Sequence, residues 1–149
     1  MVKDIAVTIP FWIIWEATAF AAFNLLARLV ASQASPQGDS FPVRAPLEIA
    51  IWIVVSLSAG FCEELIFRGY LQRQFSAFTG RIWLGVLLQG ILFGLIHPRG
   101  WRAVVVITIL GVLYGGLAAW RSNLRPGILA HGWSDLWEGW LKFAFHFNF

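Results

Sequence analysis

Charged residues and cysteine are both scarce in this sequence of 149 residues. Asp, Glu, Lys and Arg make up only 13% of the chain, about half of the roughly 25% found in soluble globular domains. A soluble domain, a disordered chain and a coiled coil all need polar residues to solvate a surface, so the composition argues against each of them. The single cysteine, Cys62, excludes an intramolecular disulfide framework. The basic residues are spread singly along the chain, so no nucleic-acid partner is expected.

Apolar residues are abundant instead, at 58% of the chain. Five apolar stretches reach or approach the roughly 20 residues with which a helix crosses a bilayer. They lie near residues 5–31, 46–75, 82–97, 102–120 and 127–145. The first stretch is too long for a signal peptide and contains Glu16, so it predicts an uncleaved membrane helix. We therefore predict an all-α fold, a polytopic membrane helix bundle of about five transmembrane helices, as a single membrane domain over residues 1–149.

Connections between these stretches are short, apart from the segment 32–45, which is rich in Pro, Gly and Ser and predicts an extended loop. Short connections imply neighbouring helices packed antiparallel in one bundle. Gly90 and Gly94, and likewise Gly111 and Gly115, are four residues apart. This spacing lets membrane helices approach one another closely.

Ionisable residues within apolar stretches are costly in lipid and are therefore functional candidates by default. They are Glu16, Glu63, Glu64, Arg68, His97, His131, Asp135 and Glu138. Six of them form three local groups on three predicted helices, and these groups are the candidates for a site.

The first group contains Glu63, Glu64 and Arg68. Residues four apart stack on one helix face, so Glu64 lies over Arg68 while Glu63 is rotated by about 100°. Arg68 keeps Glu64 ionised and tied, whereas Glu63 has no such cation and is the better candidate for a general base. A buried salt bridge that fixes helix register is the structural alternative, and it explains Glu63 badly.

The other two groups contain histidines. His97 precedes Pro98, which signals a helix end, so His97 is expected on the last turn, near the membrane interface. His131 and Asp135 are four residues apart and share a helix face, where the carboxylate would fix the tautomer of the imidazole. Taken alone, His97 is better explained as a structural residue, and the His131–Asp135 pair only weakly favours a site.

Together, the three groups predict one site, because so small a bundle has no room for three independent polar sites. Their chemistry suits hydrolysis, in which a base activates water and histidines or a metal stabilise the tetrahedral oxyanion. No Ser or Cys nucleophile is placed beside a base in the sequence. A directly activated water is therefore favoured over an acyl-enzyme.

The motifs resemble those of the CPBP family of intramembrane proteases, also called Rce1-like and named for its CAAX-processing and bacteriocin-processing members. The family pattern is EExxxR, FxxxH and HxxxN or HxxxD on successive helices. The matching residues are Glu63, Glu64 and Arg68, then Phe93 and His97, then His131 and Asp135. The runs 111–116 and 124–131 match as well. The resemblance covers about residues 47–140, which form the predicted protease core, with residues 1–45 as an extra N-terminal helix and loop.

The resemblance implies a role for each matched position. The predicted catalytic residues are Glu63 and His97, which would activate the water, His131 and Asp135, which would stabilise the oxyanion, and Glu64 and Arg68, which would support them. Glu63, His97 and His131 would also suit zinc as ligands. A metalloendopeptidase and a metal-free, glutamate-activated hydrolase therefore both stay open.

Two acids depart from the family pattern or lie outside it. Many family members carry Asn in place of Asp135, and a carboxylate cannot donate a hydrogen bond to an oxyanion. Asp135 must be protonated, accept from His131 or bind a metal, and we favour the second because the two residues already share a face. Glu16 lies outside the motifs, where it either pairs with an arginine or faces a water-filled cavity.

The leading hypothesis is an intramembrane endopeptidase of a prokaryotic cytoplasmic membrane. Its partners would be the bilayer and a membrane protein or lipid-anchored peptide as substrate. The chain is short for the family, so substrate gating relies on absent elements or on self-association. The alternative is a non-catalytic relative that binds a peptide, as in bacteriocin immunity. A transporter is disfavoured because the sequence has no clear inverted repeat.

Overall fold

The computed structural model describes residues 2–29, 45–97 and 100–145, and every regular element within these ranges is a helix. The helices are α1 (Val2–Leu29), α2 (Pro46–Glu63), the π-helix η1 (Glu64–Leu71), α3 (Gln72–Thr79), α4 (Ile82–Leu95), α5 (Trp101–Arg121) and α6 (Arg125–Phe145). Because η1 joins α2 to α3 without a break, these ranges contain five continuous helical rods. The predicted all-α membrane bundle is confirmed.

Three of the rods are long and apolar enough to cross a membrane, namely Lys3–Leu29, Pro46–Thr79 and Trp101–Arg121. The helix Ile82–Leu95 is apolar but shorter, and α6 is not among the three. About five transmembrane helices were expected, so length and composition support that expectation for three of them. The ends of all five rods lie close to the predicted ends, because hydropathy marks membrane helices strongly. The predicted loop 32–45 lies almost entirely outside the described residues.

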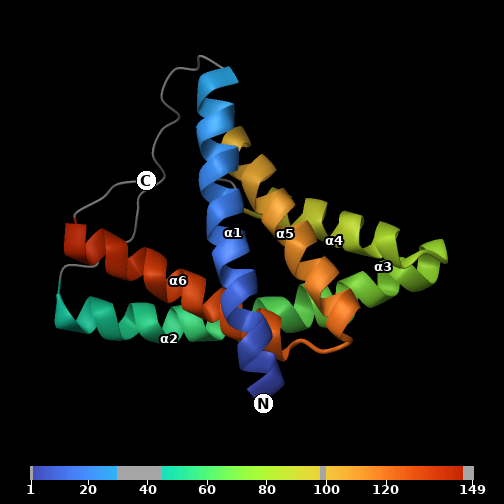
Figure 1. Cartoon of the computed structure of the whole chain (residues 1–149), viewed down its shortest axis with the longest axis horizontal. Coiled ribbons are helices and arrows are strands. Elements are labelled where there is room, and N and C mark those ends of the chain that lie inside the picture. The colour runs from blue at the N-terminus through green and yellow to red at the C-terminus, as the bar shows by residue number, and fades with distance from the viewer. Residues whose placement is uncertain (1, 30–44, 98–99, 146–149) are drawn as a thin grey trace.

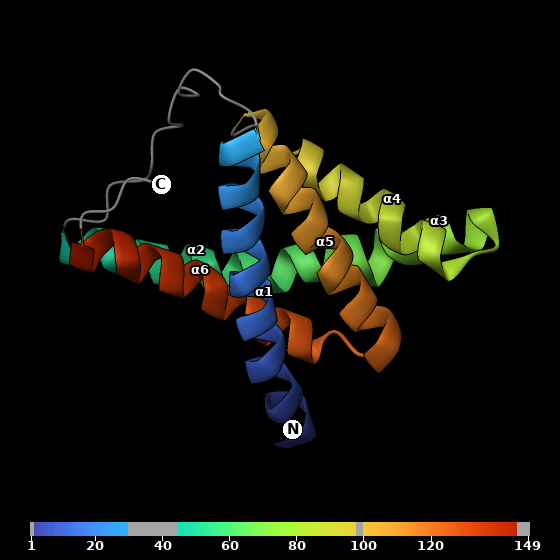
Figure 2. The same cartoon turned by 45° about the horizontal axis from the view of Figure 1, so that its top comes forward.

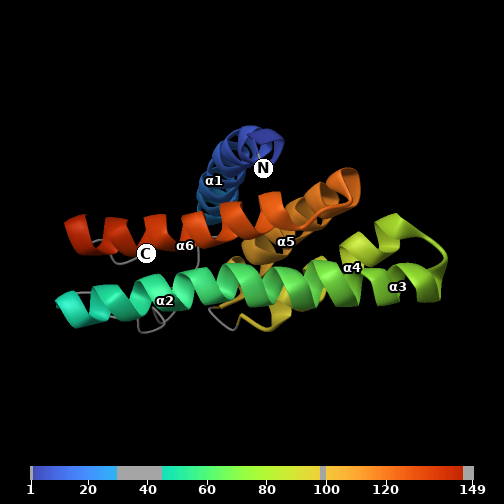
Figure 3. The same ribbon diagram turned by 90° about the horizontal axis from the view of Figure 1, so that it is seen from below.

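Some helices lie side by side and others cross. Helix α2 runs alongside α6 in the opposite direction (Figures 1 and 3). Helix α1 crosses over α6 and packs against α5, and α4 lies along α5 (Figure 2). The five rods therefore meet in one region, where η1, α5 and α6 come together.

A glycine contact brings α2 against α6. A Cβ atom added to Gly60 would lie 2.6 Å from the backbone nitrogen of Gly132 and 3.1 Å from the carbonyl oxygen of Ile128. Only glycine fits so close to a neighbouring backbone, as in membrane helix pairs generally. The contact lies one turn before Glu63 and beside His131, so it sets the separation of the first and third motifs.

The predicted close approach of glycines on α4 and α5 is also present. A Cβ atom on Gly90 would lie 3.0 Å from the backbone nitrogen of Val112 and 3.3 Å from the carbonyl carbon of Gly111. A Cβ atom on Gly94 would lie 2.6 Å from the carbonyl oxygen of Val104. These contacts hold α4 against α5 and so position Phe93, which lies between the two glycines.

The interior combines apolar and charged side chains. Its buried apolar residues include Phe67, Phe93, Val106, Leu110 and Tyr114. Its buried polar residues include Glu64, Arg68, Gln72, Gln89 and His131. Charged side chains are almost never fully buried unless they are paired. The centre of the bundle is therefore a polar site inside an apolar shell.

Candidate active site

The first motif lies where the α-helix changes to a π-helix. Glu63 is the last residue of α2, and Glu64 is the first residue of η1. π-helical turns are rare and occur frequently at functional sites. Within η1, Glu64, Phe67 and Arg68 are all buried, so this segment directs both charged groups into the bundle.

Glu64 and Arg68 form the buried ion pair that their spacing predicts. Arg68 Nη1 lies 3.0 Å from Glu64 Oε1, and the two side chains are 0% and 1% exposed. Arg68 Nη2 also donates a hydrogen bond of 3.2 Å to the carbonyl oxygen of Gly111 on α5. The guanidinium packs 4.4 Å from the centroid of the Phe93 ring. Groups on three helices therefore hold the guanidinium, and its ion pair fixes the position of the Glu64 carboxylate.

His131 lies among three carboxylates. Its Nδ1 is 3.2 Å from Glu64 Oε1, within hydrogen-bond distance. Its Nε2 is 3.7 Å from Glu63 Oε2 and 3.9 Å from Asp135 Oδ2. The structure thus joins the first motif to the third directly, through a contact between residues 67 positions apart.

The hydrogen-bond partner of His131 is not the one expected from the sequence. The spacing predicted that Asp135 accepts a hydrogen bond from the imidazole, but its 3.9 Å distance is longer than a hydrogen bond. Glu64 provides that contact instead, from another helix. The physical reason is that the close approach of Gly60 to Gly132 brings the start of η1 within reach of His131.

The two adjacent glutamates have different environments. The side chain of Glu64 is 1% exposed and contacts both Arg68 and His131, whereas that of Glu63 is 28% exposed. Spacing predicted that the two carboxylates would differ in their partners. It did not predict that both carboxylates approach the same imidazole from opposite ring nitrogens.

His97 was expected on the last turn of its helix but lies two residues beyond the end of α4, which ends at Leu95. Its Nδ1 lies 2.7 Å from the carbonyl oxygen of Phe93. A carbonyl oxygen only accepts, so Nδ1 carries the hydrogen and the neutral ring keeps a lone pair on Nε2. The Phe93 ring lies 4.8 Å from the His97 ring and 6.0 Å from the His131 ring, between centroids. Both histidines of the motifs thus pack on one phenylalanine.

The zinc ligand set expected from the sequence is not assembled. Across residues 2–29, 45–97 and 100–145, no group of three or more His, Cys, Asp and Glu side chains is arranged to hold a metal ion. Glu63, His97 and His131 are therefore not arranged as a metal centre in the described part of the chain, and of the two possibilities left open by the sequence the metalloendopeptidase is not supported.

Tyr114 is part of the site, although the sequence assigned no role to it. Its ring stacks on that of His131 at 5.2 Å between centroids with an interplanar angle of 27°. The Arg68 guanidinium lies 5.1 Å from the same ring. Tyr114 is 1% exposed. The matching run 111–116 contained this residue, but no motif spacing marked it.

Helix α1 covers the outer side of Tyr114 and α6. Phe11 packs 5.1 Å from the Tyr114 ring, between centroids. Trp12 contacts Trp133 and Trp137 edge to face, and its Nε1 donates a hydrogen bond of 3.0 Å to Glu16. Glu16 therefore has a tryptophan on its own helix as a partner, where an arginine or a water-filled cavity was expected.

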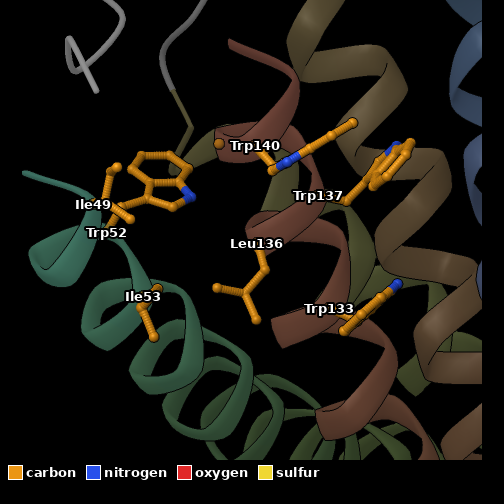
Figure 4. Close-up of a pocket in the computed structure, with 8 residues that line it drawn as sticks. Ile49, Trp52, Ile53, Trp133, Leu136, Trp137 and Trp140 are labelled. Carbon is orange, nitrogen blue, oxygen red and sulfur yellow. The ribbon is translucent and has the colours of Figure 1, made fainter. Parts of the chain in front are cut away.

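An apolar cavity of about 370 Å³ lies between α2 and α6 beside the third motif (Figure 4). Its lining residues include Trp52 and Ile53 on α2 and Trp133, Leu136, Trp137 and Trp140 on α6. Figure 4 shows Leu136 pointing toward α2, while Trp133 and Trp137 extend to the other side of α6. Trp52 Nε1 donates a hydrogen bond of 2.9 Å to the carbonyl oxygen of Asp135. The cavity thus has apolar walls, and its lining residue Trp52 is hydrogen-bonded to the helix turn that contains Asp135.

Known proteins resemble this chain in sequence. The sequence profile described as Rce1-like, "Type II CAAX prenyl endopeptidase Rce1-like", matches residues 45–137, which contain all three motifs. The Bacillus subtilis (strain 168) protein named "Uncharacterized protein YpbD" is 25% identical over 128 residues. That match covers 80% of this chain and 63% of the relative, so the chain spans less than two thirds of the relative's length. No solved structure matches the chain.

Proposed function

The chain belongs to the Rce1-like family of type II CAAX prenyl endopeptidases, and from the geometry of its site we propose that it hydrolyses peptide bonds with a water activated by Glu63. At family level it is an intramembrane protease of the CAAX type and an integral membrane protein. The observation that carries the mechanism is that Glu63 is the more exposed of two adjacent glutamates and lies 3.7 Å from His131 Nε2.

Glu63 is the base because Glu64 is already engaged. Glu64 balances the charge of Arg68 and holds the Nδ1 of His131. Giving up that carboxylate would leave a buried cation without a partner, which is strongly destabilising. Glu63 is more exposed, so it can reach water and take up a proton without disturbing the ion pair.

His131 stabilises the oxyanion. A carboxylate accepts and does not donate, so the Nδ1 of His131 carries the hydrogen toward Glu64. We propose that the ring acts in its doubly protonated form, with the carboxylates of Glu63, Glu64 and Asp135 around it. In that form Nε2–H donates to the negative oxygen of the tetrahedral intermediate.

The proposed reaction balances with these groups alone. Glu63 takes a proton from water, and the oxygen of that water attacks the carbonyl carbon of the peptide bond. The lone pair on His97 Nε2 accepts a hydrogen bond from the same water and orients it. When the intermediate collapses, the C–N bond breaks and Glu63 returns its proton to the leaving amine.

We propose a membrane protein or a lipid-anchored peptide as substrate. The tryptophan-lined cavity between α2 and α6 (Figure 4) supports this proposal, because its apolar walls suit an apolar segment or anchor beside Asp135. The similarity to a protein of Bacillus subtilis supports a prokaryotic cytoplasmic membrane as the location.

The test is the substitution Glu63→Gln, which keeps the size of the side chain but removes the base. Purified protein in lipid nanodiscs is incubated with a membrane-anchored peptide reporter, and cleavage is followed by mass spectrometry. General base catalysis contributes roughly a hundredfold or more to the rate, so Glu63→Gln should reduce cleavage at least that much. Glu16→Gln is the matched control, since its amide oxygen can still accept from Trp12, and it should cleave like the wild type.

Unchanged cleavage by Glu63→Gln would reject the mechanism. A wild-type protein that binds the reporter but yields no product, with binding retained in Glu63→Gln, would favour the non-catalytic, peptide-binding alternative. The natural substrate can be sought by comparing membrane-associated peptides from cells that express the wild type with those from cells that express Glu63→Gln.

A further inference from the structure

A second cavity, of about 550 Å³, lies among η1, α3, α5 and the start of α6. Its charged lining residues are Arg68, Arg73 and Arg125, and no acid lines it. Gln72 and Asn123 add neutral polar groups. Glu63, His97 and His131 do not line it, so the cavity is distinct from the reacting groups of the proposed site.

The charges around the cavity favour an anion. Arg68 is balanced by Glu64, and Arg125 lies 4.0 Å from Asp4, with the Arg125 side chain 72% exposed and that of Asp4 11% exposed. Arg73 is exposed and adds a further positive charge at the cavity. Because every charged side chain that lines the cavity is a cation, the local potential favours anionic ligands.

The side chains of Arg68 and Gln72 at the base of the cavity are closed off from solvent, at 2% and 5% exposed. Arg68 is held by Glu64 and by the carbonyl oxygen of Gly111, and Gln72 donates to the carbonyl oxygen of Gly115. The cations that a ligand can reach are therefore those at the rim, Arg73 and Arg125, which are both exposed.

The position of the cavity indicates where such a ligand comes from. The turn between the end of α5 at Arg121 and the start of α6 at Arg125 forms one wall, and Ile82 at the start of α4 lies on another (Figure 1). The ends of membrane helices lie at the level of the lipid headgroups. Ile82, Leu124 and Ile128 give the rest of the lining an apolar character that suits the glycerol and upper acyl region of a lipid.

We propose that this cavity binds the phosphate group of a phospholipid headgroup, held by Arg73 and Arg125 at its rim. Basic pockets between transmembrane helices recognise anionic lipids in this way. The site goes beyond the proposed peptidase activity and does not depend on it.

The experiment uses the full chain in detergent with added phosphatidylglycerol, and measures the retained lipid by native mass spectrometry. Arg73→Gln and Arg125→Gln should each weaken retention on the order of fivefold, since one basic residue near a lipid headgroup contributes about that factor. Arg81→Gln is the matched control, because Arg81 is exposed nearby but does not line the cavity. Thermal unfolding of each variant checks that the fold is retained, as expected for exposed side chains.

Equal retention by wild type and both variants would overturn the proposal. A parallel titration with inorganic phosphate separates the sources of the anion. Weak binding of free phosphate that follows the same variants, with tighter lipid retention, supports the headgroup site. Binding of free phosphate without lipid retention overturns the lipid assignment. Unchanged lipid retention with a raised KM for a peptide reporter in both variants would overturn it in favour of a peptide carboxylate.

Discussion

The substitution Gly60→Ala tests how the structure brings the first and third motifs together. The added Cβ atom would lie 2.6 Å from the backbone nitrogen of Gly132, 2.8 Å from its Cα and 3.1 Å from the carbonyl oxygen of Ile128. All three neighbours are backbone atoms of α6, so none can rotate away. Since non-bonded heavy atoms prefer roughly 3.5–4.0 Å, α2 and α6 must separate by about 1 Å.

That separation has a predictable effect on Glu64 and His131. Their contact is 3.2 Å, already the upper limit of a good hydrogen bond, and about 1 Å more would break it. A misplacement of this size can reduce an enzymatic rate by about a hundredfold. Overpacking should cost about 1–3 kcal/mol of stability, partly offset by the gain of about 1 kcal/mol in helix propensity from Gly to Ala.

Two measurements check the Gly60→Ala prediction, namely the cleavage rate on the membrane-anchored reporter and the midpoint of thermal unfolding in detergent. Gly116→Ala is the matched control, because a Cβ atom there meets nothing within 4 Å. The control should keep its activity and be as stable as the wild type or more stable. If Gly60→Ala cleaves like Gly116→Ala, the argument that α2 and α6 set the Glu64–His131 contact is refuted, whatever its stability.

Two other substitutions test the surroundings of His131. Tyr114→Leu should lower the cleavage rate by roughly tenfold, because it removes the ring that stacks on His131 and faces Arg68. Tyr114→Phe keeps the ring and should retain most of the rate. A similar loss of rate in both variants would show that the hydroxyl matters more than the ring. Asp135→Asn should cleave at a rate within about tenfold of the wild type, because Glu64 already holds His131 and an amide can donate to the oxyanion. An inactive variant with an unchanged unfolding midpoint would show that the carboxylate itself is needed.

The sequence predicted those parts of the molecule that depend on local spacing. The ends of the five rods followed from hydropathy, since long apolar runs leave a membrane chain little choice but helix. The pairing of Glu64 with Arg68 followed from their separation by four residues, because these positions share a helix face. The proline after His97 predicted a helix end at this point, and α4 ends at Leu95, two residues before His97.

The contacts between helices were predicted less well. His131 was assigned to Asp135, its neighbour on the same helix, but its hydrogen-bond partner is Glu64 on another. Glu16 was expected near an arginine or a water-filled cavity and accepts from Trp12 instead. The role of Tyr114 had no signal at all in the spacing of charged residues, because aromatic residues are common throughout this chain.

By itself, therefore, the sequence determined that the chain is a helical membrane bundle and which few ionisable residues lie inside it. Charged residues are costly in lipid, and those within apolar stretches are easily identified in a chain with only 13% charged residues. Only the tertiary structure decided which of those residues meet. The partner of His131, the stacking of Tyr114 and the shared lining of Arg68, Arg73 and Arg125 all depend on how closely the helices approach and cross. Those distances are set by contacts between backbones, such as Gly60 against Gly132, that hydropathy and helical periodicity do not register.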